Sequence, residues 1–164
     1  AEAGFRNFAI GGHRGIDRQH YQTTGPLFGW QMIGLMEGTG SSLLVGLTDS
    51  GRDLLRNLDG LSLKVPHSPR AAKAFLNYLR LYAPADSAVF VEIARAIGTT
   101  GATRKRVLEQ MADSRPDWTI NEVSTNSAGY IARAREWGLI QLKQTESMYQ
   151  LTAFGIEFLN GVLQ

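Results

Sequence analysis

The side chains that could bind a metal ion or carry out catalysis are few in this sequence of 164 residues. It contains three histidines and no cysteine, so a thiolate zinc site and a disulfide framework are both excluded. His13, His20 and His67 are far apart along the chain. They show neither the H-x-x-x-H nor the H-E-x-x-H spacing that places two metal ligands on one helix face. We therefore expect surface histidines and no metal centre.

A glycine-rich stretch, residues 9–15 (AIGGHRG), could hold an anion through its backbone N–H groups. It lacks the Lys-Ser/Thr pair of a phosphate-binding P-loop and the glycine spacing of a dinucleotide-binding turn. We expect a flexible loop here, no cofactor, and no enzymatic activity within this chain.

Composition and charge indicate a soluble globular chain with a slightly basic second part. Residues 1–66 contain six Lys or Arg against six Asp or Glu, whereas residues 67–164 contain eleven against nine. No apolar run approaches the roughly 20 residues that cross a bilayer, and the N-terminus has no basic and apolar leader. These features predict no contact with a membrane, and the absence of cysteine fits a reducing compartment, so we expect a cytoplasmic location.

Breaker residues and apolar periodicity predict a mostly helical second part. Residues 64–69 (KVPHSP) mark a boundary, and Ser68 can cap the helix that follows. Helices are expected over residues 69–83, 87–97, 103–112 and 125–137. The period then changes, because LIQLK and MYQL alternate like two short strands around the polar turn QTES. Thr152 can cap a closing helix.

This order of helices, β-hairpin and closing helix, with GLI before the hairpin and YQLTAFG after it, resembles a winged-helix domain. Gly138 would end the long helix in a left-handed cap, and Leu139 and Ile140 would begin a buried strand. Thr152 would cap the last helix, and Gly155 would let that helix pack closely.

The resemblance implies that helix 125–137 enters the major groove of double-stranded DNA and that the wing, residues 141–150, lies on the backbone. The base-reading candidates are Asn126, Ser127, Tyr130 and Arg133. The phosphate-binding candidates are Arg104, Lys105, Lys143, Gln144 and Thr145. Arg133 could bond guanine through two hydrogen bonds and Asn126 could bond adenine. The structural alternative is that the arginines cover a solvated helix face and that Tyr130 packs.

An earlier segment repeats the pattern at a constant offset. Adding 104 to the residue number aligns Gly25 with Gly129, Gly34 with Gly138, Leu35 with Leu139, Leu47 with Leu151, Thr48 with Thr152, Gly51 with Gly155 and Leu55 with Leu159. The offset predicts two winged-helix units in tandem, a reduced one over residues 1–64 and a complete one over residues 65–164. Pro26 and Gly29 replace Tyr130 and Arg133 in the first unit, so DNA contacts are expected from the second.

The expected fold class is therefore α+β, mainly helical with small β wings, and two functions stay open. One is a sequence-reading DNA-binding module, either a transcription regulator or the recognition part of a larger enzyme such as a restriction endonuclease. The other is a winged-helix scaffold that binds another protein, further domains of a longer chain or a second copy.

Two further points bear on the DNA hypothesis. The helix-turn-helix pair could be helices 103–112 and 125–137, or helices 87–97 and 103–112; the second choice would make Arg104 and Lys105 the base readers. A nuclease site would need two carboxylates and a lysine, but DGLSLK has Ser62 in place of the second carboxylate. Any catalytic part is expected outside these residues.

Overall fold

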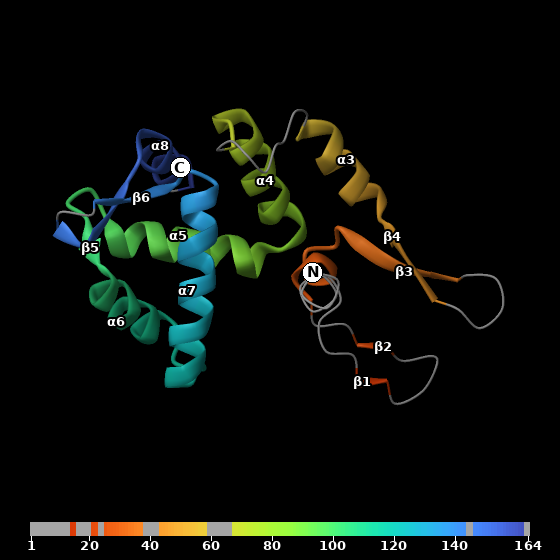
Figure 1. The fold of residues 1–164 in the computed structure, drawn as a ribbon, viewed down its shortest axis with the longest axis horizontal. Helices are drawn as coiled ribbons and strands as arrows, with labels where there is room; N and C mark the ends of the chain where they lie inside the picture. The colour runs from red at the N-terminus through yellow and green to blue at the C-terminus, as the bar shows by residue number, and fades with distance from the viewer. Residues whose placement is uncertain are drawn as a thin grey trace.

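The fold is known from a computed structural model that describes residues 14–15, 21–22, 25–37, 43–58, 67–143 and 146–162. In these residues helices predominate, and the strands form small antiparallel sheets (Figure 1). The prediction of a mainly helical α+β chain with small sheets is confirmed.

The first part of the chain contains two small hairpins and short helices. In chain order its elements are β1 (Arg14–Gly15), β2 (Tyr21–Gln22), α2 (Pro26–Gly29), β3 (Ile33–Glu37), β4 (Leu43–Leu47) and α3 (Asp49–Asn57). β1 pairs with β2 and β3 pairs with β4, both antiparallel. A short helix, a hairpin and a closing helix therefore follow one another here.

The second part contains the longer helices and a three-stranded sheet. In chain order its elements are α4 (Pro69–Tyr82), α5 (Pro84–Ile97), β5 (Ala102–Thr103), α6 (Arg104–Ser114), α7 (Ile120–Glu136), β6 (Ile140–Lys143), β7 (Met148–Leu151) and α8 (Ala153–Val162). The sheet order is β5-β7-β6, so the short strand between α5 and α6 is added to the edge of the hairpin. Figure 1 shows α7 crossing α5 and leading directly into this sheet.

The helix starts follow local capping signals. The Ser68 side chain accepts a hydrogen bond from the Ala71 backbone N–H at 3.1 Å, which confirms the predicted start of α4. α7 begins at Ile120, five residues before the predicted residue 125. Its cap is Thr119, whose N–H and hydroxyl both donate to the Glu122 carboxylate at 2.8 Å. These hydrogen bonds lower the pKa of Glu122 below its ordinary value.

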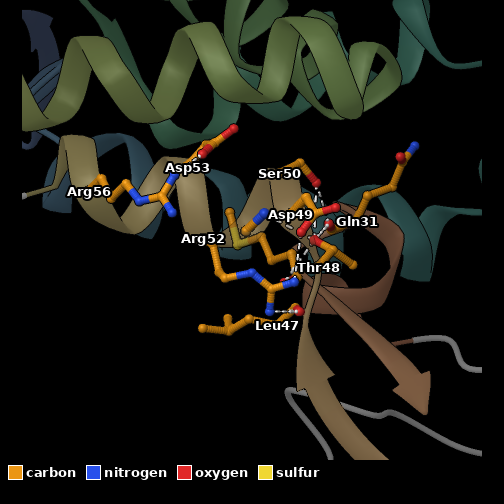
Figure 2. Close-up of polar contacts among 10 residues, drawn as sticks. Gln31, Leu47, Thr48, Asp49, Ser50, Arg52, Asp53 and Arg56 are labelled. Atoms are coloured by element: carbon orange, nitrogen blue, oxygen red, sulfur yellow. Dashed lines mark hydrogen bonds and ion pairs between the residues drawn. The ribbon is translucent and has the colours of Figure 1, made fainter.

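The start of α3 is held against the residues that precede β3 (Figure 2). The Thr48 hydroxyl donates to the Gln31 carbonyl oxygen at 2.5 Å and accepts from the Gly51 backbone N–H at 2.9 Å. A Cβ at Gly51 would lie only 2.0 Å from the Met32 carbonyl oxygen. Glycine is therefore required at this close approach between α3 and the hairpin. We call residues 30–57 the first hairpin motif.

The same arrangement occurs at the start of α8. The Thr152 hydroxyl donates to the Gly138 carbonyl oxygen at 2.5 Å and accepts from the Gly155 backbone N–H at 3.0 Å. A Cβ at Gly155 would lie 2.0 Å from the Leu139 carbonyl oxygen. We call residues 137–162 the second hairpin motif.

The matched contacts correct the sequence alignment of the two motifs. Gln31, with φ at 58°, has the hydrogen-bonding position of Gly138, with φ at 70°, so the offset there is 107 residues. The offset is 104 residues only after the hairpins, where Thr48 matches Thr152. Gly34 was aligned with Gly138 but lies within β3, opposite Gly46. An ungapped comparison could not show that the first hairpin is three residues longer.

α4 connects the two hairpin motifs through aromatic contacts. Phe75 packs edge-on against Trp30, with ring centroids 5.6 Å apart, and is stacked on Trp137 at 4.1 Å. The Tyr78 hydroxyl donates to the Trp30 carbonyl oxygen at 2.9 Å, and burial raises the pKa of Tyr78. The buried apolar side chains of both parts form one cluster. The boundary expected between residues 64 and 65 lies outside the described residues.

Candidate nucleic-acid interface

α7 presents a face of small and polar side chains to solvent. Its inner side carries the buried residues Val123, Ser127, Ile131 and Ala134. On the outer side Asn121, Thr125 and Ala132 are exposed, and Ala128 and Gly129 are half-buried. Because alanine and glycine add little bulk, the backbone of α7 can come close to a surface laid along this face.

The predicted outward position of Ser127 is wrong. Its side chain is completely buried, and its hydroxyl has no hydrogen-bond partner among the described residues. The inner stripe of α7 runs through residues 123, 127, 131 and 134, a helical spacing that includes this serine. Ser127 therefore cannot touch a molecule bound outside α7.

Tyr130 is held by contacts within the protein. Its hydroxyl donates to the Asp86 carboxylate, and its ring packs edge-on against Phe90 with centroids 5.4 Å apart. Burial, and then the hydrogen bond to Asp86, raise the pKa of Tyr130 well above its ordinary value. Tyr130 therefore packs within the protein, as the structural alternative to base reading expects.

Asn126 and Arg133 face the first part of the chain. They line a notch of about 420 Å³ between α2 and α7, together with Thr125, Gly129 and Tyr130 of the same helix. The Arg133 guanidinium lies over the Trp30 ring, 5.7 Å from its centroid, and the residue is half-buried. Helical spacing puts Asn126 and Arg133 roughly 80–100° around the axis of α7 from Thr125, so both lie on the flank that α2 adjoins.

The N-terminus of α6 carries exposed cations. Arg104, Lys105 and Arg106 are all exposed, directly after the cap Thr103. Lys105 approaches Glu109 at 3.9 Å, an exposed pair that contributes little stability. Arg104 and Lys105, which the sequence predicts to contact phosphates, are therefore accessible. Arg106 is a third exposed cation at the same end of α6.

The wing contributes one described cation. Lys143, at the end of β6, is exposed and forms an ion pair with Glu146 across the turn. Gln144 and Thr145, the other predicted wing contacts, lie outside the described residues.

The three-stranded sheet brings the α6 cations and the wing to the same end. Met148 of β7 pairs with Thr103 on one side and with Lys143 on the other. Since neighbouring strands are about 4.8 Å apart, the Cα atoms of Thr103 and Lys143 are separated by about 10 Å. Arg104 follows Thr103 directly, so the two groups of cations lie near one edge of the molecule.

The early start of α7 also changes the connection between α6 and α7. Residues 115–119 alone join these helices, whereas the sequence predicted a connection of residues 113–124. Arg115 in this connection forms two hydrogen bonds with the Glu92 carboxylate of α5, both at 2.9 Å. The connection between α6 and α7 is therefore shorter than the sequence predicts, and it is fixed to α5.

The sequence prediction leaves Asn121 outside the helix because it begins α7 at residue 125. The signal was present, since Thr119 and Glu122 have the spacing of a capping box. The sequence prediction of Arg133 as a base reader differs from its position in the structure for another reason. Its contact with Trp30 joins residues 103 positions apart, which no local pattern reveals.

The described residues show neither a group of three or more His, Asp or Glu side chains that could hold a metal ion, nor a helix long and apolar enough to span a membrane. Comparison of the sequence and the structure with protein-family models, curated proteins and solved structures gives no match.

Proposed function

We propose that this chain binds double-stranded DNA as a winged-helix module, with the outer face of α7 in the major groove. The observation that carries the proposal is the order α5, β5, α6, α7, β6 and β7 combined with the sheet order β5-β7-β6. In that arrangement α7 follows a short connection and leads into a hairpin, as a recognition helix leads into a wing. The proposal fits a regulator or the recognition part of a larger nucleic-acid enzyme.

The outer face of α7 carries side chains that could contact the floor of the major groove. Asn121 and Thr125 are exposed in its N-terminal half, the part of a recognition helix that contacts base edges. An Asn side chain can bond adenine with two hydrogen bonds, and a Thr methyl can contact the methyl group of thymine. The small residues Ala128 and Gly129 leave room for close approach. We propose Asn121 and Thr125 as the base readers.

Phosphate contacts are proposed for the cations at the sheet edge. Arg104, Lys105 and Arg106 are exposed at the start of α6, and Lys143 is exposed at the end of β6, beside the turn of the wing. The ion pair between Lys143 and Glu146 is partly exposed, so exchanging it for a phosphate costs little. Each such contact releases counterions, so binding should weaken steeply as salt increases.

Arg133 has a supporting role in this proposal. Its guanidinium packs over Trp30, so it holds α7 against the first hairpin motif. Asn126 lies beside it on the same flank, and we assign it a contact with the edge of a bound duplex. These assignments replace the base-reading roles that the sequence suggested for both residues.

Fluorescence anisotropy with a pool of random duplexes, titrated from low to moderate salt, tests the proposal. We expect Lys105→Ala to weaken binding to all duplexes and to reduce the slope of log affinity against log salt by about 1. We expect Asn121→Ala to cost about 1–3 kcal/mol at one base position of the selected sequence and to leave the slope unchanged. Arg70→Ala on α4 is the matched control, because it removes an exposed cation from another helix.

Absence of duplex binding at low salt would refute the proposal. Protein binding by the winged-helix scaffold would then be the better interpretation, and it requires a partner that stays bound after nuclease treatment. If Asn121→Ala instead weakens binding to all duplexes equally, α7 contacts the DNA backbone, and another part of the protein reads the bases.

A further inference from the structure

α4 carries a row of exposed cations on a face that the proposed DNA contacts do not use. Arg70, Lys73, Asn77 and Arg80 are all exposed and are spaced by three, four and three residues, so they lie on one side of the helix. The row is about 15 Å long at 1.5 Å per residue. None of its three cations has an ion pair with another described residue.

This row borders two clefts lined by described residues. One cleft, of about 650 Å³, lies between α3, α4 and α8, and the other, of about 410 Å³, lies between α4, α5 and α8. Both are lined by Lys73, Asn77, Phe154 and Glu157, so the two clefts adjoin along these residues, and we call them together the α4 groove.

The α4 groove combines an apolar floor with unequal charges on its walls. Leu76, Val91 and Phe158 line the second cleft. The α8 wall contributes the carboxylate of Glu157, whereas the carboxylate of Asp53 on α3 is already paired with Arg56 at 2.6 Å. The uncompensated charge is therefore positive and is concentrated on α4.

The α4 groove and the outer face of α7 lie on different sides of α5. Asp86 and Phe90 of α5 contact Tyr130 of α7. Ala88 and Val91 of the same helix line the α4 groove, roughly 100° or more around the helix axis from Phe90. A duplex laid on α7 would therefore leave the α4 groove accessible.

We propose that the α4 groove binds an acidic amphipathic helix of a partner protein. Apolar side chains of that helix would enter the second cleft, and its carboxylates would face Arg70, Lys73 and Arg80. The length of the cation row equals that of about ten helical residues, so acidic residues at i, i+3 and i+10 match its three cations. A nucleic-acid backbone fits less well, because it would meet an apolar floor and the Glu157 carboxylate.

The probe is a synthetic fluorescent peptide, roughly 15 residues long, with Leu on one helical face and Glu along its flank. Anisotropy should show saturable binding to the whole chain at low salt. We expect the double variant Lys73→Glu/Arg80→Glu to weaken binding about tenfold, and Glu157→Gln to strengthen it about twofold, because each exposed charge pair has a modest effect. The opposite signs of these effects distinguish charge recognition from a general loss of structure.

Arg106→Glu is the control that separates this proposal from DNA binding. It reverses an equally exposed cation and should weaken duplex binding while leaving peptide binding unchanged. The proposal is overturned if the peptide does not bind, if an uncharged Leu/Gln peptide binds equally well, or if the α4 double variant weakens duplex binding as strongly as Arg106→Glu. In that last case the row on α4 is a phosphate contact.

Discussion

Adding one methyl group at Gly155 tests the close contact between α8 and the second hairpin motif. In Gly155→Ala the new Cβ would lie 2.0 Å from the Leu139 carbonyl oxygen, whereas Cβ atoms do not come within 3.0 Å of such an atom. Relief of the overlap requires α8 to move by at least 1.0 Å. That movement would stretch the Thr152 hydrogen bonds to Gly138 and Gly155, which are now 2.5 and 3.0 Å long.

The free energy of unfolding should fall by about 1–3 kcal/mol. Overpacking a close contact costs about 1–3 kcal/mol, and weakening an N-cap costs about 1 kcal/mol. The higher helix propensity of alanine returns about 1 kcal/mol. For a chain of this size the melting temperature should fall by about 2–12 °C.

Urea unfolding followed by far-UV circular dichroism measures the change. Gly161→Ala is the matched control on the same helix, because a Cβ there meets nothing within 4 Å. It should leave stability unchanged or raise it by up to about 1 kcal/mol. Gly51→Ala should reproduce the loss, since its Cβ would lie 2.0 Å from the Met32 carbonyl oxygen. A Gly155→Ala protein as stable as Gly161→Ala would refute the close approach.

Three other substitutions test contacts around α7. Ser127→Ala should raise the free energy of unfolding by about 1–2 kcal/mol, because it removes a buried hydroxyl without a partner, and it should leave duplex affinity unchanged; a loss of affinity would restore a binding role. Tyr130→Phe should lower stability at neutral pH by about 1–2 kcal/mol, since it leaves the Asp86 carboxylate without its donor. The raised pKa of Tyr130 means that its contribution is complete below pH 10 and is lost as the pH rises further, so urea midpoints should decline less above pH 10 in the variant than in the parent protein. Arg115→Lys should cost about 1 kcal/mol, because a lysine cannot form both hydrogen bonds to Glu92; a double-mutant cycle with Glu92→Gln measures the coupling, and additive effects would contradict it.

The sequence predicted the features that depend on neighbouring residues. Ser68 and Thr152 each stand directly before a helix, so the side-chain oxygen can accept a hydrogen bond from the backbone N–H three residues later. Both caps are present in the structure. The same rule would have found the start of α7 at Thr119, where the capping box was overlooked.

Features that depend on distant residues were not predictable in this way. Gln31 adopts the left-handed conformation that a glycine has at Gly138, so a residue-by-residue alignment of glycines chose Gly34 instead. The position of Arg133 depends on Trp30, whose place is fixed in turn by Phe75 and Tyr78 of α4. The candidate site therefore shifted along and around α7, although the helix itself was expected.

The contacts of Phe75 tie both hairpin motifs to one side chain. Trp30 and Trp137 hold the same position in the two motifs, each closing the helix before its hairpin with a backbone hydrogen bond four residues back. Trp30 meets the Phe75 ring edge-on, whereas Trp137 is stacked on it, so one aromatic ring serves both motifs through unlike contacts. A substitution at Phe75 would therefore disturb two motifs at once, although they are distant in the sequence.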